Sequence, residues 1–170
     1  MSYINPSPGN PAQQIIVKVK ISGQGNTTAN IVSVPALQNM TINNATDVFS
    51  WSQLDNASKL QVPTTATNSV AMNLVVDHDS FFGSNGNLSG DQLPEMGLMG
   101  ASKNKSLVLF SIRASADAGD PTFIQGSGYV TSLAPAVTAE QPVFVSPITI
   151  AVTGDYTVAT SEVAADWGLS

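Results

Sequence analysis

Apolar and polar residues alternate with a period of two along several segments of this chain, and this pattern most restricts its fold. Within residues 15–22, Val17 and Val19 fall on one side of an extended strand, and Lys18 and Lys20 fall on the other, toward solvent or a partner. Charged helix formers are scarce, with three Glu, five Lys and one Arg in the whole chain. The pattern therefore predicts an all-β fold, a β-sandwich or barrel with one short flanking helix.

The same alternation predicts the other strands. Residues 107–113 are apolar on both sides, so we expect this strand to lie centrally or to be covered by another element. Pro147 is expected to break the last strand, because proline cannot donate to a ladder. Between residues 35 and 69 the pattern is poor, and we expect irregular loops around one or two short strands. The expected strands are residues 15–22, 70–76, 107–113, 122–133 and 143–158, with weaker ones at 30–34 and 47–52.

Gly126 and Gly128 lie two positions apart in one expected strand and therefore on the same face of it. A glycine pair of this kind lets another backbone or a bulky ring approach closely, or marks a β-bulge.

A long connection, residues 77–106, separates two of the strands. We expect a short helix from Asp91 to Gly100 within it, with Leu93 and Met96 at helical spacing. A loop of this length inside a compact domain is usually functional or disordered, and its adjacent Phe81 and Phe82 require burial. The two rings either fill the end of their own sandwich or anchor the segment on another molecule.

Length and charge narrow the functions further. A chain of 170 residues with 42% apolar residues can bury one core, so we expect a single domain over residues 1–170. Residues 1–14 are polar and rich in proline, which predicts a flexible N-terminal arm and no secretory signal. The net charge of −6 argues against general nucleic-acid binding and against adhesion to an anionic membrane.

The usual catalytic patterns are missing from the sequence. There is one histidine, and there is no cysteine, phosphate-binding loop or nucleophile elbow. Asp77, His78 and Asp79 resemble the start of a calcium loop, but Leu88 stands where a bidentate Glu is needed. We therefore predict a protein that is not an enzyme and has no cofactor or metal.

Four segments carry a resemblance to a known family. They are Val70-Ala-Met-Asn-Leu-Val-Val-Asp77, Leu107-Val-Leu-Phe-Ser-Ile112, Gly126-Ser-Gly-Tyr-Val-Thr-Ser-Leu133 and Ile148-Thr-Ile-Ala-Val-Thr-Gly-Asp155. In their order and in their local amino-acid sequence, these segments resemble the strands of tail tube proteins from tailed bacteriophages, over roughly residues 69 to 158.

The resemblance implies a hexameric ring whose inner sheets join neighbours into one barrel. Stacked rings would form a hollow tube through which phage DNA passes without specific binding. Expected partners are copies of this chain, a sheath protein, a tape measure protein, and baseplate or tail terminator proteins. The expected location is the virion tail, after assembly in the host cytoplasm.

The resemblance implies that strands 122–133 and 143–158 contribute to the shared barrel. The net negative charge of the chain would repel the phosphate groups of DNA. Small or polar side chains on the non-core face would present a smooth wall. The barrel candidates are Gly126, Gly128, Thr149, Ala151 and Thr153, and the subunit or ring contacts are Phe81, Phe82, Leu93 and Met96.

Two other functions remain open from the sequence. A capsid decoration protein, or another β-rich virion surface protein, would also assemble from many copies but would form no tubes. A carbohydrate-binding module would use Trp51 or Tyr129 to line a groove.

Overall fold

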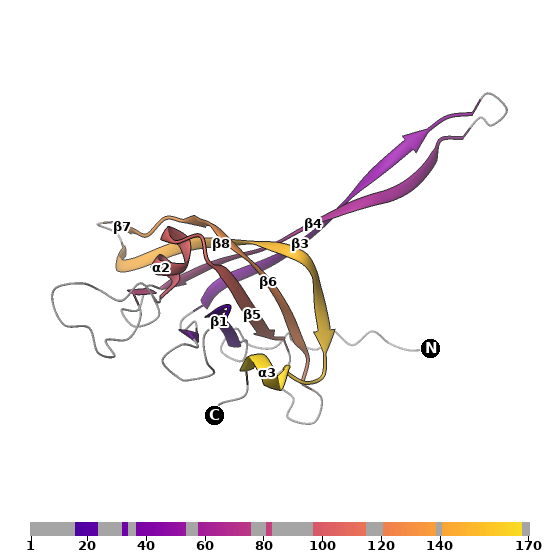
Figure 1. Ribbon diagram of the computed structural model, residues 1–170. Coiled ribbons are helices and arrows are strands. Elements are labelled where there is room, and N and C mark those ends of the chain that lie inside the picture. Colours follow the sequence, from indigo (N-terminus) through magenta and orange to yellow (C-terminus); the bar gives the residue numbers. More distant parts are fainter. Residues whose placement is uncertain are drawn as a thin grey trace, which may run out of the picture.

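The computed structural model describes residues 16–23, 32–33, 37–53, 58–75, 81–82, 97–114, 121–138 and 141–167. These residues form one bent antiparallel sheet with a short helix on its concave side and a projecting hairpin (Figure 1). Within the described ranges, no helix is long and apolar enough to span a bilayer.

The sheet has eight strands, and the all-β prediction with a short flanking helix is confirmed. The hydrogen-bonded order is β2-β1-β5-β6-β8-β4-β3, with β7 paired to β8. Every neighbouring pair is antiparallel. The strand bounds are β1 Ile16–Ile21, β2 Val32–Ser33, β3 Leu37–Trp51, β4 Leu60–Val75, β5 Leu107–Arg113, β6 Phe123–Leu133, β7 Ala136–Thr138 and β8 Gln141–Ala159.

One face of the sheet carries the hydrophobic core. The predicted alternation is observed in β4, where Val70, Met72 and Leu74 are buried and the residues between them are partly exposed. β5 lies centrally between β1 and β6, as its two apolar faces predict. The core joins five strands and one helix, and its buried members are Val17, Val19, Val70, Met72, Leu74, Leu98, Ala101, Val108, Phe110, Ile112, Val130, Ile148 and Ile150.

The prediction of irregular loops between residues 35 and 69 is wrong. β3 and β4 form a long hairpin there, with partners running from Leu37 opposite Leu74 to Trp51 opposite Leu60. Only the half of β4 from Ser69 to Val75 also pairs with β8, so the other half extends beyond the sheet (Figure 1). That half has no buried face in the subunit, and in its sequence the alternation of apolar and polar residues is confined to Leu60 and Val62 at its outer end.

β8 runs unbroken through Pro147, contrary to the prediction of a break. Pro147 lies one residue beyond the end of the pairing with β6, at Ile148 opposite Leu133. On the other side Pro147 still has a register partner, Asn73 of β4. A proline is tolerated at such a position because the ladder with β6 has already ended.

The flanking helix α2, Leu98–Lys103, overlaps the predicted range only at residues 98–100 and continues three residues beyond it. Residues 91–96, including the predicted contacts Leu93 and Met96, lie outside the described residues. Lys105 ends the helix in a left-handed conformation with φ 51°. The amides of Lys105 and Ser106 donate to the carbonyls of Ser102 and Ala101, which completes a Schellman motif. A lysine rather than a glycine takes the left-handed position, so the sequence gives no clear stop signal.

The two glycines of β6 allow the close approaches that the sequence suggests. A Cβ on Gly126 would lie 2.7 Å from the ring of Phe110, and one on Gly128 would lie 2.2 Å from the carbonyl oxygen of Ala151. The register with β8 also shifts at Gly126, where residues 154–156 of β8 bulge opposite it. Here β8 bends sharply, and Gly154 has a positive φ of 73° (Figure 1).

Replacing Gly128 with alanine should destabilise the subunit strongly, because the new methyl group would collide with backbone rather than with a side chain that can move. We expect a loss of about 1–3 kcal/mol in the free energy of unfolding, measured by denaturant titration. Gly126→Ala is the matched control and should cost less, since its nearest neighbour is the far end of the Phe110 ring. Equal stability of Gly128→Ala and the unmodified chain would contradict the close approach.

Candidate assembly surfaces

The projecting part of the hairpin, residues 43–51 with 60–69, is here called the arm. Eight residue steps separate the pair Asn43–Ser69 at its base from the pair Trp51–Leu60 at its outer end. At about 3.3 Å per residue this corresponds to an arm roughly 25 Å long. A two-stranded hairpin of this kind is marginally stable alone in water, so an exposed arm favours docking on another surface.

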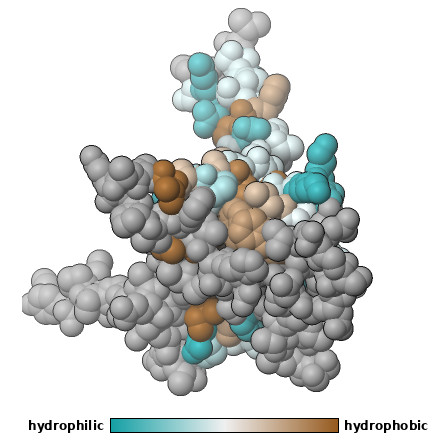
Figure 2. Space-filling view, turned by 90° about the vertical axis from the view of Figure 1, so that its left-hand side faces the viewer, coloured by the Kyte–Doolittle hydropathy of each residue, from teal (hydrophilic) through white to brown (hydrophobic). Residues whose placement is uncertain are grey.

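One face of the arm near its outer end is apolar. Phe49 lies opposite Val62 and Trp51 lies opposite Leu60, so all four side chains share a face. The rings of Phe49 and Trp51 stack with centroids 5.8 Å apart. Phe49 is 61% exposed. Figure 2 shows apolar side chains in brown among the white and teal ones of the arm, which rises above the body.

A second surface is the non-core face of β3, β4, β6 and β8, here called the neutral face. Its rows cross the sheet in register, as where Ser69, Ala151 and Tyr129 stand side by side. The predicted wall residues Thr149, Ala151 and Thr153 lie on this face, because Ile148 and Ile150 point into the core. Asp155, farther along β8 at its bend, is not part of the neutral face, whose members are all uncharged: Thr41, Asn43, Ser69, Ala71, Asn73, Ser127, Tyr129, Ser132, Thr149, Ala151 and Thr153.

The C-terminal segment, residues 161–167, covers the non-core side of β1 and β5. It ends in the short helix α3, Ala164–Trp167. Glu162 accepts a hydrogen bond from Lys18 Nζ at 2.8 Å and another from Ser111 Oγ at 2.7 Å. Lys20 donates to the carbonyl oxygen of Asp166 at 2.6 Å. Lys20 is therefore buried, at 3% exposure, rather than directed to solvent as the alternation alone suggests.

Removing the Glu162 carboxylate should loosen this cover. Glu162→Ala leaves the buried Ser111 hydroxyl without its acceptor and Lys18 without its ion-pair partner. We expect a loss of about 1.5–3 kcal/mol in the free energy of unfolding. In a Trp51→Phe background, the fluorescence of Trp167 should shift to the red as it becomes exposed. An unchanged emission maximum together with unchanged stability would contradict this role.

The other site residues suggested by the sequence have separate positions. Phe81 is buried, at 1% exposure, and its ring meets that of Phe82 edge-on with centroids 5.1 Å apart. This burial favours the alternative in which the pair fills its own fold. Asp77, His78 and Asp79 and the N-terminal residues 1–14 lie outside the described residues. The described part of the chain contains no cluster of three metal-ligating residues.

The apolar face of the arm is the feature that sequence reasoning missed. A signal for it exists, because Phe49 and Trp51 are two residues apart before the turn, and Leu60 and Val62 are two residues apart after it. This spacing is typical of a hairpin with one apolar face.

The fold matches solved structures of tails and injection devices. A chain of the SPP1 tail tube is 13% identical with a TM-score of 0.63, and the match covers 89% of this chain and 79% of that chain. A chain in the tail of an empty gene transfer agent particle with C6 symmetry is 12% identical with a TM-score of 0.57, over 88% and 98%. A chain of the 6-fold symmetrised anti-feeding prophage baseplate is 12% identical with a TM-score of 0.59, over 94% and 97%.

No family model and no curated protein matches the sequence. The structural likeness extends over most of each chain, so the chain has a tail-tube-like fold.

Proposed function

We propose that this chain is the structural subunit of a phage tail tube, which assembles as stacked hexameric rings around a lumen that conducts DNA. The observation that carries the proposal is the likeness of nearly the whole chain to chains of tail assemblies, including one with C6 symmetry. The subunit would be located in the virion tail after assembly in the host cytoplasm. Its partners would be copies of itself. In the assembled tube, a sheath protein would lie on the outer wall, a tape measure protein in the lumen, and baseplate or tail terminator proteins at the ends.

In this proposal the sheet is completed by neighbours. The strand order leaves β2 and β3 at the two edges, each with one unpaired side among the described residues. An open sheet edge is a template for pairing with another chain, and a closed ring removes such edges. β6 and β8, with Gly128 close to the backbone of β8 and Gly126 close to Phe110 of β5, would then form part of the barrel wall.

The neutral face has the chemistry needed for a wall along which DNA slides. Fixed cations would bind the phosphate backbone and hold it, because phosphate contacts supply most of the nonspecific affinity for DNA. The neutral face offers hydroxyl, amide, methyl and phenol groups and no ammonium or guanidinium group. With a net charge of −6 on the chain, DNA would pass such a surface with little retention.

Electron microscopy of the purified chain tests the proposal. At high concentration we expect hollow tubes whose class averages show six-fold symmetry, with rings of six subunits by native mass spectrometry. A chain that remains monomeric at every concentration, or that forms closed trimers, would contradict the proposal and favour the decoration protein.

A further inference from the structure

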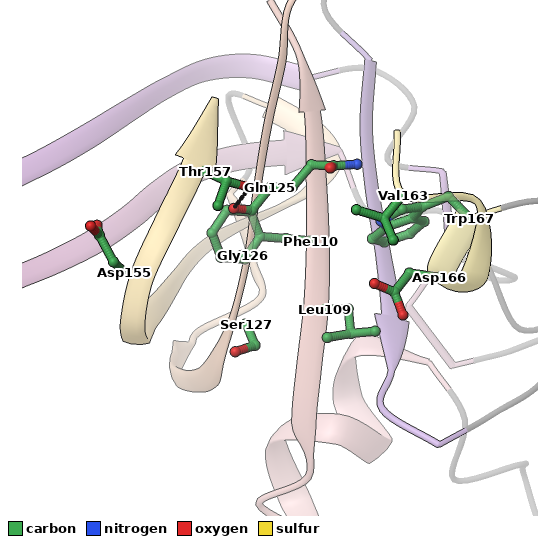
Figure 3. Close-up of a pocket in the computed structure, with 10 residues that line it drawn as sticks. All are labelled: Leu109, Phe110, Gln125, Gly126, Ser127, Asp155, Thr157, Val163, Asp166 and Trp167. Atoms are coloured by element: carbon green, nitrogen blue, oxygen red, sulfur yellow. Dashed lines mark hydrogen bonds between the residues drawn. The ribbon is translucent and has the colours of Figure 1, made fainter. Parts of the chain in front are cut away.

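An acidic groove of about 190 Å³ lies between α3 and the non-core face of β5, β6 and β8. In Figure 3, Trp167 and Asp166 border it on the side of α3, and Ser127 and Gly126 border it on β6. Asp155 lies at its far end on β8. The groove therefore joins the C-terminal segment to the bend of β8.

The groove contains an unsatisfied acceptor in addition to its carboxylates. Gln125 is 5% exposed and lines the groove. Its amide nitrogen donates to Ser111 Oγ at 3.5 Å, and its Oε1 atom has no hydrogen-bond partner. A buried amide oxygen without a donor is costly, and its uncompensated partial negative charge adds to that of the groove.

The charges of the groove point to a cation. Among the described residues, its lining includes two carboxylates, Asp155 and Asp166, and no basic side chain. Lys20 lies nearby, over the ring of Trp167, but its ammonium group already donates to the Asp166 carbonyl oxygen. Trp167 and the half-exposed Val163 add an apolar wall, which suits the methylene chain of a lysine.

We propose that this groove binds Lys59 at the outer end of the arm of a second copy of the chain. Lys59 directly precedes β4, next to Leu60 and the apolar face of the arm. It is exposed and stands on the element that extends farthest from the body (Figure 1). The positive charge of the lysine complements the carboxylates of Asp155 and Asp166, and the adjoining apolar face of the arm matches Val163 and Trp167. This contact rests on the proposed tube, whose subunits must meet through extended elements.

Zero-length carbodiimide crosslinking tests the contact directly. Wild-type assemblies made from equal amounts of ¹⁴N-labelled and ¹⁵N-labelled chain are treated with the reagent, which joins an amine to a carboxylate that touches it. Mass spectrometry should find Lys59 joined to Asp155 or Asp166 in mixed-isotope pairs. Links confined to a single chain, or links from another lysine to the groove, would overturn the proposal.

Charge reversal gives an independent measurement. Lys59→Glu should raise the concentration needed for assembly at least tenfold, whereas Lys105→Glu, an equal charge change on an exposed residue outside the arm, should change it less than threefold. Asp155→Lys should restore assembly of Lys59→Glu. Asp155→Asn keeps the acceptor for the Tyr156 amide and should weaken assembly by itself. Circular dichroism confirms that each variant is folded.

The outcomes separate this contact from the proposed function. Wild-type tubes without a Lys59 link, and with unchanged assembly of Lys59→Glu, would overturn the contact and leave the tube intact. A wild-type chain that never assembles would overturn both.

Discussion

Replacing Phe49 and Trp51 together with serine should abolish tube formation at concentrations where the unmodified chain assembles fully. The two rings stack on the exposed apolar face of the arm, and large aromatic side chains dominate the energetics of most protein interfaces. If each contributes about 2 kcal/mol to the contact, the critical concentration rises by roughly 1,000-fold. The critical concentration is measured by sedimenting the assembled material over a series of protein concentrations.

Val48→Ser is the matched control for this variant. Val48 is 52% exposed at nearly the same height on the arm, but it lies opposite Pro63 and therefore on the other face. Its replacement should shift the critical concentration much less. The midpoint of thermal unfolding of the body should stay within a few degrees of that of the unmodified chain in both variants, because neither face of the arm contributes to the hydrophobic core. Equal loss of assembly in both would show that the arm acts without a preferred face.

The sequence predicts the body of this fold well because the body has a core. β1, β5 and the sheet-paired half of β4 direct one face into the hydrophobic core, and this imposes the period of two by which they were predicted. The outer arm buries neither face in the isolated subunit, so the period of two is kept there only in short stretches, Phe49 with Trp51 and Leu60 with Val62. Periodicity alone therefore did not reveal the long pairing of β3 with β4 in the region that was expected to be irregular.

The covered lysine shows a second limit of local patterns. Lys20 alternates with Val19 and Ile21 as a solvent-facing residue would, yet α3 covers it from a position 146 residues along the chain. Residues 47–52 suggested only a weak strand, and the pairing of Trp51 with Leu60 depends on register across the turn. Strand register, and burial by segments that are distant in sequence, depend on the whole folded sheet, so they cannot be inferred from short stretches of sequence.

Phe81→Ala should destabilise the folded subunit more than it affects any contact between subunits. Phe81 is 1% exposed, and truncation of a buried phenylalanine typically costs about 3–5 kcal/mol. For a chain of 170 residues this lowers the midpoint of thermal unfolding by about 10 °C. The measurement is calorimetry on the monomer, below its assembly concentration.

Phe82→Ala separates the two roles that the sequence allows for this pair of rings. Phe82 is only partly buried, so its truncation should cost much less stability, and any effect on assembly can then be measured on a folded chain. Normal tubes from Phe82→Ala, together with the large stability loss in Phe81→Ala, would show that the pair fills its own fold. Poor assembly of a stable Phe82→Ala chain would instead support the predicted anchor. A Phe81→Ala chain as stable as the unmodified one would contradict the burial on which both arguments depend.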